Sequence, residues 1–182
     1  MSDTKINFKY VLATLAAVLF TWLLHEFAHW GTAEALGYTA FMSLNGTSFA
    51  DYKNITPWQH TIISAAGPII TLLQAVVVFL FLKYNRWNLY LYPLLFTAFY
   101  MRLLAGGMNF INPNDEGRIS QFLGLGTYTI PVLVSTFLLY LLYYITKQYS
   151  LSWRFQAITL LWVMVFSAIL ILLDQFLGVQ LL

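Results

Sequence analysis

The motif His-Glu-Phe-Ala-His at residues 25–29 places three ionisable side chains in five positions of an otherwise uncharged apolar segment, residues 10–30. On a helix, residues four apart lie on one face about one turn apart, so the imidazoles of His25 and His29 can bind one metal ion from the same side. Glu26 is turned about 100° from His25, which places its carboxylate beside a water on the metal rather than on the metal itself. This spacing is that of zinc peptidases in which the glutamate acts as general base.

The same motif can arise by chance, and the end of a helix can carry histidine and glutamate merely as interfacial residues. A charged side chain near the centre of a bilayer costs roughly 2.5–3.5 kcal/mol on insertion scales. Three ionisable residues in five positions therefore need a partner that offsets this cost, and a zinc ion is one. We interpret His25 and His29 as metal ligands and Glu26 as a catalytic residue.

The composition indicates a chain that is embedded in a lipid bilayer. Of its 182 residues, 60% are hydrophobic and only 9% are charged, and apolar runs long enough to cross a bilayer recur along the chain. The net charge of +2 is too small to indicate a nucleic-acid partner, and the absence of cysteine excludes thiol catalysis and cysteine-bound zinc. We expect a single membrane-embedded domain over residues 1–182, multi-pass in a prokaryotic cell membrane, whose first apolar run is retained and not cleaved.

We expect an all-α multi-pass membrane protein with about five transmembrane helices. The first starts at Tyr10 and continues past Trp30 to Leu36, and Gly37 then provides a C-terminal stop. The other four are expected over about residues 59–82, 87–110, 128–145 and 155–176. Tyrosines between residues 140 and 149 gather near the fourth-to-fifth turn, as an aromatic belt at the membrane interface would.

A short β-hairpin is expected between the first and second helices. Asn45-Gly46 is the preferred pair for a tight type I′ turn, and residues 41–44 and 47–50 flank it as short strands. One interpretation is a small connector on the solvent side. The other is a hairpin beside the metal site that offers an edge strand to an extended peptide.

A catalytic zinc site usually has three protein ligands, so one further ligand is needed. The segment of residues 112–118 is the best candidate, because Pro113 and Gly117 should break the helix there. Broken backbone at membrane depth occurs where it lines a cavity or is buried in protein, although a plain connecting loop is the alternative. Asp115 or Glu116 could then reach the metal. Three other ionisable residues are less well placed: Glu34, His60 and Asp174.

Three motifs, in chain order, resemble those of the site-2 protease family of intramembrane metalloproteases. Residues 25–37 look like the zinc helix of that family, and Gly67-Pro68 resembles the Gly-Pro motif of its next core span. Asn112-Pro113 with Asp115 resembles the Asn-Pro-Asp-Gly element that supplies its third ligand. A protease-like core is therefore expected over about residues 10–125, with two additional helices over about residues 128–176.

The resemblance implies an intramembrane zinc endopeptidase. His25, His29 and Asp115 would hold Zn²⁺, and Glu26 would take a proton and later deliver it to the leaving amine. The implied partner is a transmembrane segment of a protein or peptide substrate within the lipid bilayer, and a regulatory membrane partner or a homo-oligomer is left open. Five residues are implied as substrate-binding or supporting positions: Asn45, Gly67, Pro68, Asn112 and Glu116.

Two departures from the family pattern keep alternatives open. Asn114 and Glu116 are interposed around Asp115, so Asp115 is favoured as third ligand but Glu116 is not excluded. The asparagine that usually follows Gly-Pro is absent, its place near Ile70 and Thr71 being taken by an apolar residue and a threonine. The alternative function is a proteolytically inactive zinc-binding scaffold or chaperone related to such proteases. A transporter or channel is a third class, which no inverted repeat supports.

The orientation in the membrane is a point of conflict. In a five-span arrangement six basic residues fall at one membrane face: Lys5, Lys9, Lys83, Arg86, Lys147 and Arg154. The positive-inside rule puts that face, and the N-terminus, in the cytoplasm. His25 lies about 24 Å along the helix from Lys9, so the site would open toward the non-cytoplasmic face. The sites of the family typically open toward the cytosol.

Overall fold

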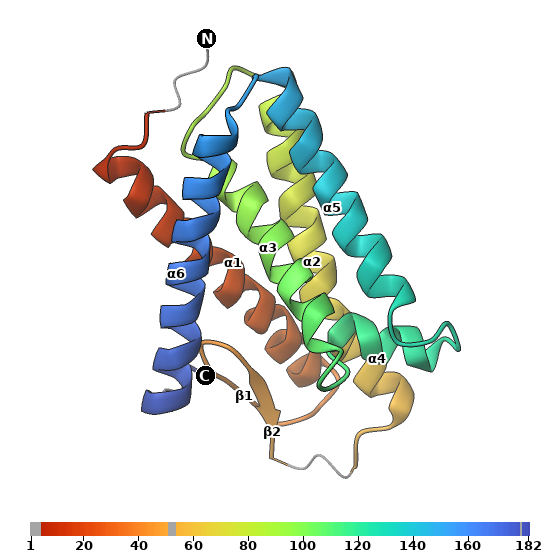
Figure 1. Cartoon of the computed structure of the whole chain (residues 1–182). Coiled ribbons are helices and arrows are strands. Elements are labelled where there is room, and N and C mark those ends of the chain that lie inside the picture. The colour runs from red at the N-terminus through yellow and green to blue at the C-terminus, as the bar shows by residue number, and fades with distance from the viewer. Residues whose placement is uncertain (1–4, 51–53, 179) are drawn as a thin grey trace.

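The computed structural model describes residues 5–50, 54–178 and 180–182, and within these ranges the chain forms six helices and one two-stranded sheet (Figure 1). The order along the chain is α1 (Phe8–Ala35), β1 (Ala40–Met42), β2 (Thr47–Phe49), α2 (Pro57–Tyr84), α3 (Tyr92–Met108), α4 (Asp115–Phe122), α5 (Thr129–Gln148) and α6 (Trp153–Leu177). The expectation of an all-α chain with a hairpin between the first and second helices is confirmed.

Within the described residues, four helices are long and apolar enough to cross a membrane: α1, α2, α5 and α6. The expected third span forms α3, which has 17 residues and is about 26 Å long at 1.5 Å per residue. This helix packs against α1, α2, α5 and α6 and lies in the middle of the bundle (Figure 1). The shortest of the five expected spans is therefore the one that the other helices surround.

Local sequence signals set the ends of the long helices. Asn7, Thr56 and Ser152 accept backbone N–H groups at the first turns of α1, α2 and α6. At the other end of α1, Gly37 adopts a φ of 87°, as the predicted C-terminal stop requires. These caps fix both ends of α1 and the start of α2, and hence the relative height of the residues that the two helices carry.

The hairpin pairs β1 with β2 in antiparallel register, with Phe41 opposite Ser48, but its turn is not the predicted type I′. A type I′ turn needs a positive φ at both central residues, and among the described residues neither Asn45 nor Gly46 has one. The carboxylate of Asp174 in α6 explains the difference, since its two oxygens accept from the backbone N–H of Leu44 at 2.9 Å and the hydroxyl of Ser43 at 3.2 Å. A contact from the last helix thus shapes this turn.

The predicted break after the third expected span is present, since α3 ends at Met108 and α4 starts at Asp115. Asn109 stabilises the break: its side-chain oxygen accepts from the backbone N–H of Asn114 at 2.7 Å. Gly117 lies inside α4 and does not break the helix, contrary to the expectation. A Cβ atom at this position would overlap the side-chain oxygen of Asn109, so a glycine is needed for that close approach.

Candidate metal centre

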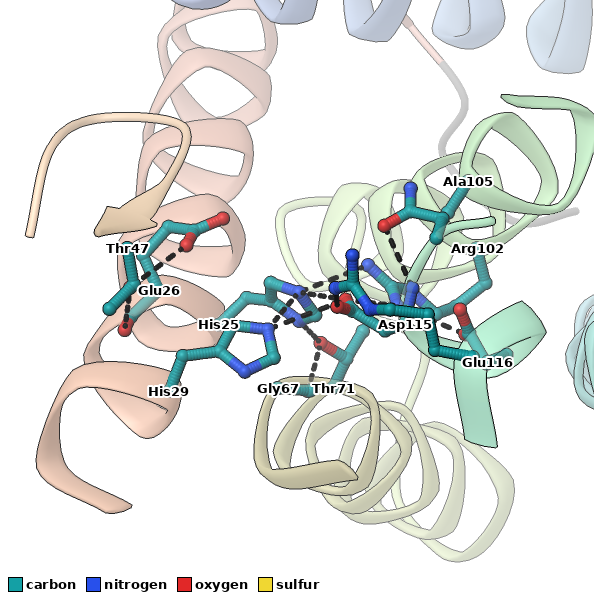
Figure 2. A network of polar contacts seen from close by, with 12 residues as sticks. His25, Glu26, His29, Thr47, Gly67, Thr71, Arg102, Ala105, Asp115 and Glu116 are labelled. Carbon is teal, nitrogen blue, oxygen red and sulfur yellow. Dashed lines mark hydrogen bonds and ion pairs between the residues drawn. The ribbon is translucent and has the colours of Figure 1, made fainter. Parts of the chain in front are cut away.

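His25, His29 and Asp115 converge at the point where α1 faces the start of α4 (Figure 2). Nε2 of His25 lies 3.1 Å from Nε2 of His29, and Oδ2 of Asp115 lies 3.2 Å and 3.4 Å from these two nitrogens. All three residues are buried. The two predicted histidine ligands and the favoured acidic residue therefore come together.

Hydrogen bonds fix which nitrogen of each imidazole carries the proton. Nδ1 of His25 lies 3.1 Å from Oγ1 of Thr71, whose own proton is donated to the carbonyl of Gly67 at 2.9 Å, so Nδ1 must be the donor. Nδ1 of His29 lies 2.6 Å from the carbonyl of Ile63, which can only accept. Each neutral ring therefore turns the lone pair of Nε2 toward the other ring and Asp115.

This arrangement fits a cation. Two Nε2 lone pairs and a carboxylate oxygen lie about hydrogen-bond distance from one another, and all three are acceptors. With both rings neutral, no proton lies between them. Their mutual repulsion is relieved when a positive ion lies between them. The buried group of His25, His29 and Asp115 can therefore bind a metal ion.

Gly67 in α2 allows the two imidazoles to lie this close to the second helix. A Cβ atom at position 67 would overlap Nε2 of His29 and Cε1 of His25, and it would lie 2.6 Å from Nε2 of His25. Any side chain here must displace the rings. Pro68 follows as a buried residue inside α2. Gly67 is thus placed against the metal group, as a supporting rather than a ligand position.

Asp115 is the first residue of α4, where the helix dipole favours a carboxylate. Its Oδ1 accepts from the guanidinium of Arg118 at 2.7 Å, which leaves Oδ2 directed at the histidines. Besides Arg118, the guanidinium of Arg102 lies 3.8 Å from Oδ2, and two nearby cations favour the ionised form of a carboxylate. Asp115 therefore stays ionised, as a metal ligand must.

Glu116 lies away from the metal group and pairs with Arg102 of α3 (Figure 2). The two charged groups are 3.0 Å apart, and both side chains are almost fully buried. The same guanidinium lies 3.4 Å from Nε2 of His25 and 3.8 Å from Oδ2 of Asp115. Arg102 is therefore a buried cation in direct contact with the metal group, with Glu116 as its counter-charge.

Glu26 lies beside the group and is held by the hairpin. The hydroxyl of Thr47 in β2 lies 3.3 Å from Oε2 of Glu26 and 3.3 Å from its backbone carbonyl. Glu26 is not part of the group that could hold a metal, in agreement with its predicted position beside the ligands. The hairpin thus lies beside the metal site, which is the placement that the second sequence interpretation expected; its edge strand for a peptide stays a prediction.

A cavity of about 500 Å³ connects these residues. The metal group and Glu26 line it, as do Asn45 and Thr47 of the hairpin region and Gln175 of α6. Asn112, which the family resemblance implied as a supporting residue, is exposed and lies outside this lining. The substrate-binding or supporting roles of Asn45, Pro68 and Asn112 stay predictions.

Three residues that contact the site were not predicted from the sequence as part of it: Thr47, Thr71 and Arg102. Arg102 carried a usable signal, because an arginine inside an apolar run is rare and needs a buried partner. Thr71 carried a weak signal, since it lies near the place where the resembled family has an asparagine, and Thr47 carried none. Comparisons of the chain with protein-family models, with curated proteins and with solved structures gave no match.

Proposed function

We propose that this chain is an intramembrane zinc metalloendopeptidase that cleaves a transmembrane segment of a membrane-protein substrate. The observation that carries the proposal is the convergence of His25, His29 and Asp115 with a fourth ionisable residue, Glu26, on one cavity. A structural metal site has no need of a free carboxylate beside its ligands. A hydrolytic site needs one to move protons.

The spacing of the three ligand atoms supports zinc as the metal. Zinc binds histidine nitrogen and carboxylate oxygen at about 2.0–2.2 Å in tetrahedral geometry, and neighbouring ligand atoms of such a tetrahedron lie about 3.3 Å apart. The three distances in this group are 3.1, 3.2 and 3.4 Å. Two imidazoles and one carboxylate also form a donor set typical of catalytic zinc, which keeps its fourth position open.

Bound zinc would polarise the scissile carbonyl and lower the pKa of an attacking water toward about 7. Glu26 takes the proton of that water on its carboxylate and delivers it to the leaving nitrogen. Thr47 orients this carboxylate by its contact with Oε2. Thr71 and the carbonyl of Ile63 keep both imidazoles in the tautomer that a ligand requires.

The substrate must be locally extended, because a helical peptide bond is shielded by its own hydrogen bonds. In the hairpin, the backbone groups of Ala40 and Met42 point away from β2, given the register. The chain itself uses them: Ala40 donates to Glu34 at 2.8 Å, and Met42 exchanges hydrogen bonds with Leu181 and Leu182. This favours β2, which lines the cavity, as the strand that receives a substrate segment.

Glu26→Gln tests the proposal. The purified full chain and the variant are reconstituted with synthetic transmembrane peptides, and products are identified by mass spectrometry beside a zinc determination. We expect Glu26→Gln to lower cleavage by about 10²–10⁴-fold while zinc stays near one ion per chain. His25→Ala should lose both. Equal processing by Glu26→Gln and wild type would refute peptidase chemistry and leave the inactive zinc-binding scaffold as the function.

A further inference from the structure

A second hollow lies at the far end of the bundle from the metal group, where α2 ends beside the end of α5 (Figure 1). Its volume is about 520 Å³. Two lysines, four tyrosines and one glutamine line it: Lys83, Tyr84, Tyr140, Tyr143, Tyr144, Lys147 and Gln148. We call this hollow the basic groove. The metal site and the proposed peptidase activity make no use of it.

The helical period of α5 places its part of the lining on one face. Tyr140, Tyr143, Tyr144 and Lys147 follow the spacing i, i+3, i+4 and i+7. From α2, Lys83 meets this face, and its ammonium lies 5.1 Å from the ring centre of Tyr144. The side-chain amide of Gln148 donates to the carbonyl of Lys83 at 3.1 Å and so joins the two helix ends. The lining is therefore assembled by contacts between two helices.

The basic groove is positively charged. Among the described residues no carboxylate lines it, and neither Lys83 nor Lys147 forms an ion pair. Both lysines lie in the last turn of their helices, where each helix end contributes about half a negative charge. Two full positive charges exceed this, and a net charge of about +1 is left for an anionic ligand.

Apolar side chains continue from the groove along both helices toward the middle of the membrane. Leu80 lies about one turn before Lys83 and Tyr84, and Phe137 lies one turn before Tyr140; both are more than 40% exposed. A free inorganic anion can contact only the charged part of the groove. A phospholipid can contact both parts, because its acyl chains begin directly below its phosphate.

We propose that the basic groove binds the phosphate headgroup of an anionic phospholipid, with the lysines as counter-charges and the tyrosine hydroxyls as hydrogen-bond donors. Basic pockets between transmembrane helices are known to bind such headgroups, and tyrosine is favoured at headgroup level. The acyl chains lie along Leu80 and Phe137. The site takes the headgroup at the membrane surface that carries most of the basic residues of this chain.

The test compares two charge-matched double variants of the full chain. Lys83→Gln with Lys147→Gln empties the groove of charge, whereas Arg86→Gln with Arg154→Gln removes the same charge from exposed positions outside the groove. Each protein is placed in phosphatidylcholine nanodiscs, and dioleoyl phosphatidylglycerol is titrated in. Bound phosphatidylglycerol is counted by native mass spectrometry after release from the nanodisc.

Wild type and the arginine double variant should retain one phosphatidylglycerol per chain, and the lysine double variant should bind it about 30-fold more weakly. The proposal is overturned if the two double variants lose affinity equally, because general surface charge would then suffice. It is also overturned if inorganic phosphate displaces the lipid at equal concentration, or if phosphatidylcholine is retained as well as phosphatidylglycerol.

Discussion

The imidazole of His25 and the hydroxyl of Thr71 form a hydrogen bond of 3.1 Å across 46 residues of sequence, and this bond determines which nitrogen of His25 faces the metal group. Thr71 lies close to where the site-2 protease pattern has an asparagine. A threonine can serve here because its proton is already donated to the carbonyl of Gly67, which leaves its oxygen as a pure acceptor. The departure from the family pattern is thus compatible with a metal site.

Thr71→Val removes this acceptor without changing the volume of the side chain much. Since metal ligands that lose such a partner typically lose 10–100-fold in metal affinity, we expect a loss of about that size. Thr71→Ser keeps the hydroxyl and should stay close to wild type. Competition against a zinc chelator measures both. Equal affinities for the valine and serine variants would show that the tautomer of His25 is set by another contact.

Gly67→Ala should remove the metal by displacing both imidazoles, since its Cβ would overlap atoms of His25 and His29. Overpacking of this kind costs about 1–3 kcal/mol of stability in addition. Gly31→Ala is the control, because Gly31 lies on α1, the helix that carries His25 and His29, with no atom within 4 Å of the added Cβ. We expect Gly31→Ala to keep full zinc content. Zinc retained by Gly67→Ala would mean that the rings have room to move.

The amide pair Asp115→Asn and Glu116→Gln separates the two acidic residues. Asp115→Asn should lose most of the zinc, because an amide oxygen is a much weaker ligand than a carboxylate. Glu116→Gln should keep zinc but lose up to about 3 kcal/mol of stability, because Arg102 then retains a buried charge with only Asp115 nearby, at 3.8 Å. Zinc content and thermal unfolding measure the two effects. Zinc lost only from Glu116→Gln would move the third ligand to Glu116.

Thr47 offers a test of the hairpin as a substrate-binding strand. Its N–H points away from β1, so Thr47→Pro leaves the ladder of the hairpin intact while it removes the outward donor. Thr47→Val removes only the contact with Glu26 and should lower the cleavage rate about tenfold. We expect Thr47→Pro to lower it at least about fivefold further, with unchanged zinc. Equal rates for the two variants would leave β2 without a role in binding the substrate.

The sequence predicted relations between residues that are close along the chain. It did not predict contacts between residues that are far apart along the chain. His25, Glu26 and His29 were found because a helix repeats every 3.6 residues, so their relation is local. The ends of the helices followed from single residues such as Gly37. Thr71, 46 residues from His25, is brought to the site only by the packing of α2 against α1, which no local pattern encodes.

The turn of the hairpin shows that a contact distant in sequence can also override a local signal. Asn45-Gly46 is a strong local signal for a type I′ turn, yet the turn differs because Asp174, 130 residues further along, binds the backbone of Leu44. The hydrogen bonds from a half-buried carboxylate outweigh the local preference here. The choice between Asp115 and Glu116 was open for a related reason, since it depends on Arg102, whose partner on α4 the sequence did not indicate.

The charges of the structure predict that the metal site opens away from the cytoplasm. The start of α1, the α2–α3 connection and the α5–α6 connection lie at one end of the bundle, and the hairpin and α4 lie at the other (Figure 1). Among the residues that the structure describes, Lys9, Lys83, Arg86, Lys147 and Arg154 belong to the first end and Arg118 to the second, while Lys53 lies outside the described ranges. The positive-inside rule then places the first end in the cytoplasm.

Single-cysteine labelling can decide the orientation cleanly, because the chain contains no cysteine and each variant carries one thiol. Tyr90→Cys marks the basic end and Leu123→Cys marks the end with the metal site, and both positions are well exposed. With a membrane-impermeant maleimide on intact cells, we expect Leu123→Cys to react at once and Tyr90→Cys to react only after lysis. The opposite pattern would turn the metal site toward the cytosol, as is typical of site-2 proteases, and would mean that the few charges at the metal-site end outweigh the basic end. Neither result depends on proteolytic activity, so the orientation can be established before a substrate is known.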